Sequence, residues 1–316
     1  MRNSKIVNIR ALAIIIVVLG HSIILYSKSW GFFESIYDVP ILDYLKSFIN
    51  IIQMPLFFSL SGFLFYYSIN KKSDFKNFFK KKFKRLLIPF LMIGIFWMIP
   101  IKLLIGYSGY QNLTLFQIIS KLFLGTDSGH LWYLPTLFII FMIAYFMKKV
   151  FNKRYELLIT LLLLAISYLS IYINIYPYLN QALCYFYYFY IGMLINKHQN
   201  KKINLHLLIF ITFLSFLIML WFKNIRLLEF AFVTSLIILI YQTINGKDIK
   251  LMKIISDNSY GIYLIHSPLV YITYTYLTNA NPIIVVVINF MVFGGIALLL
   301  SNLIRKSKLK FILGEN

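Results

Sequence analysis

The chain has 316 residues, of which 60% are hydrophobic and only 13% are charged. Soluble globular domains carry about 25% charged residues, so this composition excludes an ordinary water-soluble fold. The net charge of +21 does not indicate nucleic-acid binding, because the lysines and arginines lie in short runs between apolar stretches. Such runs are expected to face anionic lipid headgroups. Composition and charge together therefore predict an integral membrane protein.

Ten hydrophobic stretches follow one another along the chain, and each is a candidate for crossing about 30 Å of hydrocarbon. They cover residues 6–27, 45–69, 86–107, 131–147, 155–173, 180–196, 203–222, 227–244, 259–277 and 282–304. Too few residues remain between them for a separate soluble domain. We therefore predict an all-α integral membrane protein, in which residues 1–316 form one domain with about ten transmembrane helices in one bundle.

The distribution of basic residues predicts the orientation of the bundle. If the N-terminus is cytoplasmic, 25 of the 31 lysine and arginine residues fall in segments assigned to the cytoplasm. An excess of basic residues marks cytoplasmic loops, so both termini are predicted to be cytoplasmic. The longer outer connections, at about 28–44 and 108–130, then collect most of the outer polar residues.

Two ionisable residues, Arg10 and His21, lie within the first hydrophobic stretch. An ionisable group in hydrocarbon costs about 2.5 to 3.5 kcal/mol on insertion scales, which makes each one a functional candidate. Their separation of 11 residues places both on one face of a helix, about 16 Å apart. This spacing alone leaves a simpler interpretation open, in which Arg10 snorkels to the headgroups and His21 is a packing residue.

Five motifs, in chain order, resemble those of the acyltransferase 3 family of integral membrane acyltransferases. They are Arg10 with His21, then residues 54–63 (MPLFFSLSGF), 85–89 (RLLIP), 130–134 (HLWYL) and 259–268 (SYGIYLIHSP). The chain is similar to polysaccharide O-acetyltransferases of this family over nearly its whole length. It departs from the pattern at Lys82, where many members have arginine, so one planar guanidinium is lost.

The resemblance implies a membrane O-acyltransferase that uses a cytoplasmic acyl-coenzyme A, most often acetyl-coenzyme A, and no permanently bound cofactor. It implies that His21 is catalytic, either as a general base on the acceptor hydroxyl or as a carrier of the acyl group, and both routes remain open. Arg10, Lys82 and Arg85 are implied to bind the anionic end of the donor, although Lys82 has topology signalling as an alternative role.

Residues near the acceptor or the cavity are expected in the two remaining motifs. They are His130, Trp132, Tyr133, Tyr263 and His266. The first three have interfacial anchoring as an alternative role, and His266 could equally bond a neighbouring helix. No metal site is expected, because the chain lacks a His-Glu-x-x-His or similar spacing.

The expected partners are acyl-coenzyme A, a cell-envelope glycan or its lipid-linked precursor, and membrane lipids, but not nucleic acid. The expected location is the bacterial plasma membrane.

A transporter or exporter of glycan or small acids is the alternative, because multi-span bundles with a polar residue at the midplane also describe transporters. Paired broken helices in two similar halves would favour it, and the sequence shows none. A noncatalytic membrane scaffold is a third interpretation, but it does not explain why Arg10 and His21 lie within a hydrophobic stretch.

Overall fold

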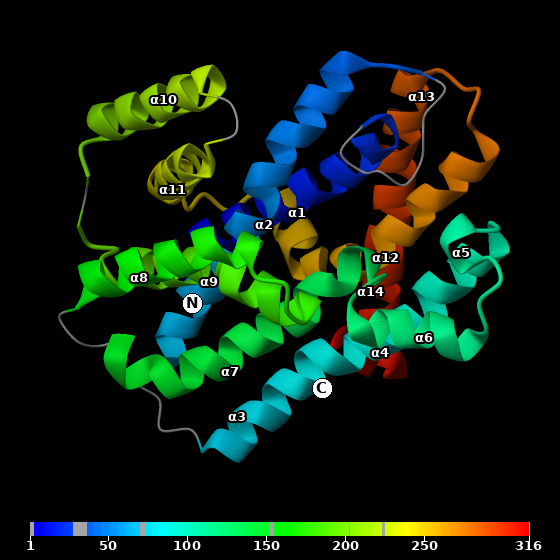
Figure 1. The fold of residues 1–316 in the computed structure, drawn as a ribbon, viewed down its shortest axis with the longest axis horizontal. Coiled ribbons are helices and arrows are strands. Elements are labelled where there is room, and N and C mark those ends of the chain that lie inside the picture. The colour runs from blue at the N-terminus through cyan, green and yellow to red at the C-terminus, as the bar shows by residue number, and fades with distance from the viewer. Residues whose placement is uncertain are drawn as a thin grey trace.

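The computed structural model describes residues 3–27, 37–69, 74–151, 155–201, 203–222 and 225–315, and these contain helices and connections without any β-strand (Figure 1). The helices are α1 (Ser4–Ile23), α2 (Pro40–Ile69), α3 (Phe75–Lys82), α4 (Ile88–Ile93), α5 (Ile99–Leu104), α6 (Leu115–Leu124), α7 (Tyr133–Phe151), α8 (Glu156–Leu169), α9 (Pro177–Lys197), α10 (Leu205–Trp221), α11 (Arg226–Thr243), α12 (Lys250–Tyr276), α13 (Pro282–Val287) and α14 (Gly294–Lys306). The predicted all-helical class is confirmed.

All ten predicted stretches overlap helices, but only six helical runs in the described residues are long and apolar enough to span a membrane. These runs are Ser4–Tyr26, Pro40–Ser68, Phe75–Leu104, Gly129–Phe151, Arg226–Thr243 and Pro282–Lys306. Helices α8 and α10 are shorter. Helices α9 and α12 are long but bury polar side chains, such as Asn196, Asn258 and His266, which lower their hydropathy. The structure therefore supports a multi-pass membrane protein and leaves the number ten a prediction.

Two segments that the sequence predicts as loops contain helix. The basic segment before residue 86 forms α3, which continues through a π-helical turn, Phe83–Leu87, into α4. In the outer connection at 108–130, Thr114 and Gln117 form a capping box that starts α6, and Gly125 ends it in the left-handed conformation, with φ 76°. Hydropathy missed α3 because it is short and highly charged, and it missed α6 because it is short, although its caps stabilise it.

Helix α1 packs against both α2 and α12 at the centre of the molecule, while α10 and α11 form a pair at one side (Figure 1). Helices α2 and α9 cross at Gly62 and Gly192. A Cβ atom on Gly62 would lie 1.8 Å from the carbonyl oxygen of Phe189, and one on Gly192 would lie 1.8 Å from that of Ser59. The backbones of α2 and α9 approach this closely because both residues are glycine.

The two ends of the described chain lie at the same end of the bundle. Ser4 Oγ donates to Asp248 Oδ1 at 2.7 Å, which places the start of α1 beside the start of α12. Ser301 Oγ near the end of α14 donates to Asn258 Oδ1 at 3.0 Å, in the first third of α12. This arrangement matches the predicted placement of both termini on one side, although which side is cytoplasmic stays a prediction.

Candidate active site

His21 lies in the last turn of α1 and faces a cavity of about 290 Å³. The cavity is lined by His21, Ile24, Lys46, Asn50, Gln53, Gly129, His130, Trp132, Ser267, Val270 and Tyr271. The Nδ1 atom of His21 lies 2.9 Å from the carbonyl oxygen of Val17. Because a carbonyl only accepts hydrogen bonds, Nδ1 carries the proton in the neutral ring and Nε2 keeps its lone pair. Nε2 is therefore the nitrogen available to accept a proton.

Two further histidines converge on His21. The ring centroid of His266, on α12, lies 4.9 Å from that of His21, and the ring of His130, in the turn before α7, lies 6.4 Å away. His266 Nδ1 lies 2.7 Å from the Ile262 carbonyl oxygen, so it donates there as His21 does to Val17. His266 Nε2 and His130 Nδ1 are buried and make no hydrogen bond within the described part of the chain. The described residues hold no group of three or more His, Cys, Asp or Glu side chains that could bind a metal ion.

Pro268 leaves a carbonyl oxygen of α12 free to accept a hydrogen bond from His130. Proline lacks an N–H, so Pro268 inside α12 leaves the Leu264 carbonyl without its usual intrahelical donor. His130 Nε2 lies 3.1 Å from this carbonyl oxygen and donates to it. Tyr263 Oη also donates to the His130 carbonyl oxygen, so the turn before α7 is fixed to α12 at both its backbone and its side chain. Pro268 and His130, which are 138 positions apart, are thereby connected through the Leu264 carbonyl.

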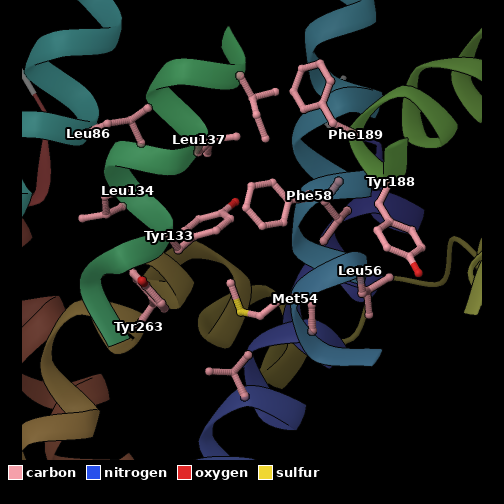
Figure 2. Packing of buried hydrophobic residues seen from close by; sticks show 14 of the residues in the cluster. Met54, Leu56, Phe58, Leu86, Tyr133, Leu134, Leu137, Tyr188, Phe189 and Tyr263 are labelled. Atoms are coloured by element: carbon pink, nitrogen blue, oxygen red, sulfur yellow. The ribbon is translucent and has the colours of Figure 1, made fainter. Parts of the chain in front are cut away.

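A layer of aromatic residues borders the histidines. Figure 2 shows Tyr133 of α7 facing Phe58 of α2, and their ring centroids lie 4.8 Å apart. The Tyr133 hydroxyl lies 3.0 Å from Ser61 Oγ, which also donates to the Phe57 carbonyl. Trp132 lines the cavity and its ring centroid lies 5.4 Å from that of Tyr185. Ser61 thus bonds both a tyrosine of α7 and its own helix, which indicates a role in packing.

Sequence reasoning missed the contribution of α2 to the cavity. Lys46, Asn50 and Gln53 are spaced four and three residues apart, so they share one face of α2, and all three line the cavity. Polar residues at helical spacing within an apolar stretch are a readable signal of such a face. Gly20 lets this face approach α1, because a Cβ atom there would lie 2.8 Å from Gln53 Oε1 and 3.3 Å from Lys46 Nζ.

Arg10 lies between this cavity and the cytoplasmic end predicted from the basic residues. Its guanidinium acts electrostatically on the hydroxyls of both Tyr133 and Tyr241, so it belongs to the polar interior of the bundle. Its role in binding the donor stays a prediction.

A second, basic pocket of about 530 Å³ opens among α3, the start of α4 and the end of α14. It is lined by Asn77, Lys80, Lys81, Lys84, Arg85, Arg305, Gly314 and Glu315. Arg305 Nε donates to both carboxylate oxygens of Glu315, at 3.0 and 3.1 Å. The predicted donor residue Arg85 lies here, whereas Lys82 Nζ lies over the ring of Phe141, 3.3 Å from its centroid. The sequence did not identify Arg305 or the C-terminal segment as part of this pocket.

Another proline, Pro89, connects Arg85 to the 259–268 motif on α12. Pro89 lacks an N–H for the Arg85 carbonyl four residues before it, and Tyr260 Oη donates to that oxygen at 2.6 Å. Tyr260 lies one turn before Tyr263 on α12, and the ring centroids of Tyr263 and Tyr133 are 5.6 Å apart. Polar groups therefore continue from the basic pocket through α12 to the histidines.

The fold and the cavity define a multi-pass helical membrane protein with a histidine-lined interior site. The family model of the acyltransferase domain matches residues 3–304, which is nearly the whole chain. The chain therefore belongs to the acyltransferase 3 family of membrane acyltransferases, as its five motifs predicted. No curated protein and no solved structure shows a significant match.

Proposed function

We propose that the protein transfers an acyl group, most often acetyl, from cytoplasmic acyl-coenzyme A to a hydroxyl of a cell-envelope polysaccharide or its lipid-linked precursor. The observation that carries this proposal is the orientation of His21. Its Nδ1 donates to the Val17 carbonyl, which leaves the Nε2 lone pair for a substrate proton beside a 290 Å³ cavity. The plasma membrane of a bacterium is the location that fits such a reaction.

In the direct route, His21 Nε2 takes the proton of the acceptor hydroxyl while the hydroxyl oxygen attacks the thioester carbonyl carbon. The tetrahedral intermediate then collapses, the C–S bond breaks, and the coenzyme A thiolate receives the proton from the imidazolium. The products are an acyl ester and free coenzyme A. In the alternative route, Nε2 attacks the thioester first, and the acceptor oxygen displaces the imidazole from the acyl group, its proton passing to the thiolate.

The donor is proposed to enter from the basic pocket. The phosphates of coenzyme A are anionic, and guanidinium and ammonium groups bind phosphate through charge-assisted hydrogen bonds. Lys80, Lys84, Arg85 and Arg305 supply such groups around a 530 Å³ space. Tyr260, Tyr263 and Tyr133 connect Arg85 to the histidine region, and the thioester arm is proposed to reach the histidines along this side of α12. Lys82, which lies over Phe141, is proposed to support this region through packing and charge.

The acceptor is proposed to bind in the histidine cavity. Asn50, Gln53 and Trp132 provide hydrogen-bonding groups and an aromatic face, a combination that suits sugar rings. His130, Tyr133, Tyr263 and His266 are proposed to shape this cavity and orient its polar groups.

The experiment incubates the purified protein in lipid with radiolabelled acetyl-coenzyme A, alone and with candidate glycans. We expect His21→Ala to reduce donor turnover and acyl transfer by about 100-fold or more, because general-base catalysis contributes about 10²- to 10⁴-fold. His206→Ala is the matched control, since His206 is an exposed histidine at the start of α10 and should leave activity unchanged. Full transfer by the His21→Ala protein would refute the mechanism. Vesicle uptake of glycan without donor turnover in either protein would identify a transporter instead.

A further inference from the structure

Lys46 is a buried cation that the mechanism does not use. Its side chain is 3% exposed, lines the His21 cavity, and acts electrostatically on both His21 and His266. It makes no hydrogen bond and no ion pair with any residue that the structure describes. Removing an ammonium group from water without a counter-charge is costly, so a cation kept in such a place indicates a functional site.

A second buried lysine of this chain, Lys102, has a counter-charge within the protein. Lys102 is 1% exposed, and its Nζ lies 2.6 Å from Asp127 Oδ1, so its charge is neutralised within the protein. The residues that line the Lys46 cavity include no aspartate and no glutamate. Gln53 Oε1 lies against Gly20, as Lys46 Nζ does, and this oxygen has no hydrogen-bond partner in the described residues. Within the part of the chain that the structure describes, the charge of Lys46 therefore faces the cavity without a counter-charge.

We infer that Lys46 makes the cavity select acceptors that carry an anionic group, a carboxylate or a phosphate, close to the hydroxyl that is acylated. This inference rests on the proposed function and assigns the substrate class of its site. Lys46, Asn50 and Gln53 share one face of α2, so an anion on Lys46 places the neighbouring sugar atoms along the amides, with His21 on the adjacent helix. The amides bind sugar hydroxyls, and the apolar side chains of Ile24 and Val270 contact the ring.

The first experiment measures binding without turnover, so its result can be read even if the proposed function fails. The thermal-unfolding midpoint of the purified protein is recorded with glucuronate, with glucose and with inorganic phosphate. Saturating coenzyme A is present throughout to occupy the basic pocket. Glucuronate and glucose differ by a carboxylate in place of a hydroxymethyl group, so their comparison isolates the charge. The measurement with inorganic phosphate distinguishes a phosphate-bearing acceptor from an acidic sugar.

We expect an anion to raise the midpoint more than glucose does in the wild-type protein, and Lys46→Met to abolish that difference. Lys121→Met is the control, because Lys121 is a half-buried lysine of α6 that donates to the Gly109 carbonyl outside the cavity. Identical midpoints with all three compounds in the wild type would overturn the inference. An anion effect that persists in Lys46→Met would also overturn it, because the anion would then bind elsewhere. Lys46→Gln serves as a second variant if Lys46→Met fails to fold.

The second experiment compares acyl transfer to an oligosaccharide that contains glucuronic acid and to its carboxyl-reduced neutral counterpart. We expect Lys46→Gln to lower kcat/KM for the acidic acceptor by about 10- to 100-fold, mainly through KM, and to change the neutral one little. An equal loss of kcat for both acceptors would overturn the inference, because Lys46 would then stabilise the reacting oxygen and not the acceptor's anion. If neither the wild type nor His21→Ala transfers an acyl group to either acceptor, the result would instead count against the proposed function.

Discussion

At the scale of single residues, the buried ion pair of Lys102 and Asp127 stabilises the connection between α5 and α7, beside the cavity. Lys102 Nζ also lies 4.4 Å from the ring centroid of Tyr107 and 5.6 Å from that of Tyr271, which lines the cavity. Burial, and then the Asp127 carboxylate, raise the pKa of Tyr110 in the same cluster. The pair thus holds aromatic residues beside the site.

Breaking this pair should be strongly destabilising. Lys102→Met would leave the Asp127 carboxylate buried without its counter-charge, which costs about 3 to 5 kcal/mol for such pairs. We expect a clear fall in the thermal-unfolding midpoint of the purified protein. The double variant Lys102→Met with Asp127→Asn should recover most of that loss, because no buried charge remains. A single variant as stable as the wild type would show that the pair contributes little.

At the scale of helices, the crossing of α2 and α9 depends on two glycines, and α2 carries Lys46, Asn50 and Gln53 into the cavity. The close approach at Gly62 and Gly192 sets the position of α2, and aromatic residues fill the space beside it (Figure 2). Phe58 of α2, for example, stacks on Tyr185 of α9 with ring centroids 4.7 Å apart. A change at this crossing therefore shifts α2, the helix that carries Lys46, Asn50 and Gln53.

Gly62→Ala should separate α2 from α9, since the new Cβ atom would lie 1.8 Å from the Phe189 carbonyl oxygen. Overpacking of this kind costs about 1 to 3 kcal/mol or more, so the unfolding midpoint and acyl transfer should both fall. Gly295→Ala on α14 is the matched control, because a Cβ atom there meets nothing within 4 Å. Alanine also has the higher helix propensity, so this control should be as stable as the wild type or slightly more so. Equal midpoints for the two variants would contradict the packing argument.

At the scale of the whole molecule, the bundle places the basic pocket and the histidine cavity at different depths. Arg85 and Arg305 lie with the end of α14, whereas His21 lies in the last turn of α1, whose first turn is bonded to Asp248. The donor and acceptor sites of the proposed reaction therefore face opposite ends of the bundle. This separation suits transfer across a membrane only if the basic end is cytoplasmic.

Orientation can be measured with single cysteines in a Cys184→Ser background and a membrane-impermeant maleimide. We expect Asn279→Cys, in the connection between α12 and α13, to be labelled in intact cells. Ser307→Cys, just after α14, should be labelled only after permeabilisation, because it adjoins the basic residues Arg305 and Lys306. The reverse pattern would overturn the predicted cytoplasmic termini and the assignment of the donor side.

The sequence by itself determined the helical class, the membrane character and the family, because hydropathy and short motifs are local properties. It also selected Arg10 and His21, as ionisable residues in the first hydrophobic stretch that match a family motif, and it selected His130 and His266 as candidates. Six of the ten predicted stretches form runs that are long and apolar enough to span a membrane, whereas α8 and α10 are shorter and α9 and α12 bury polar side chains, so the number ten stays a prediction. Hydropathy measures composition and carries no information about which face of a helix is covered.

Only the tertiary structure decided which candidates meet. The Leu264 carbonyl that Pro268 leaves open accepts from His130, and the Arg85 carbonyl that Pro89 leaves open accepts from Tyr260. Each contact joins residues more than 100 positions apart, so no local pattern reveals it. The same holds for Lys46, which reads as an ordinary lysine near a helix start until Gly20 brings α2 against α1. The effect of a buried charge on stability and function depends on the groups that surround it, and packing between distant helices decides which groups those are.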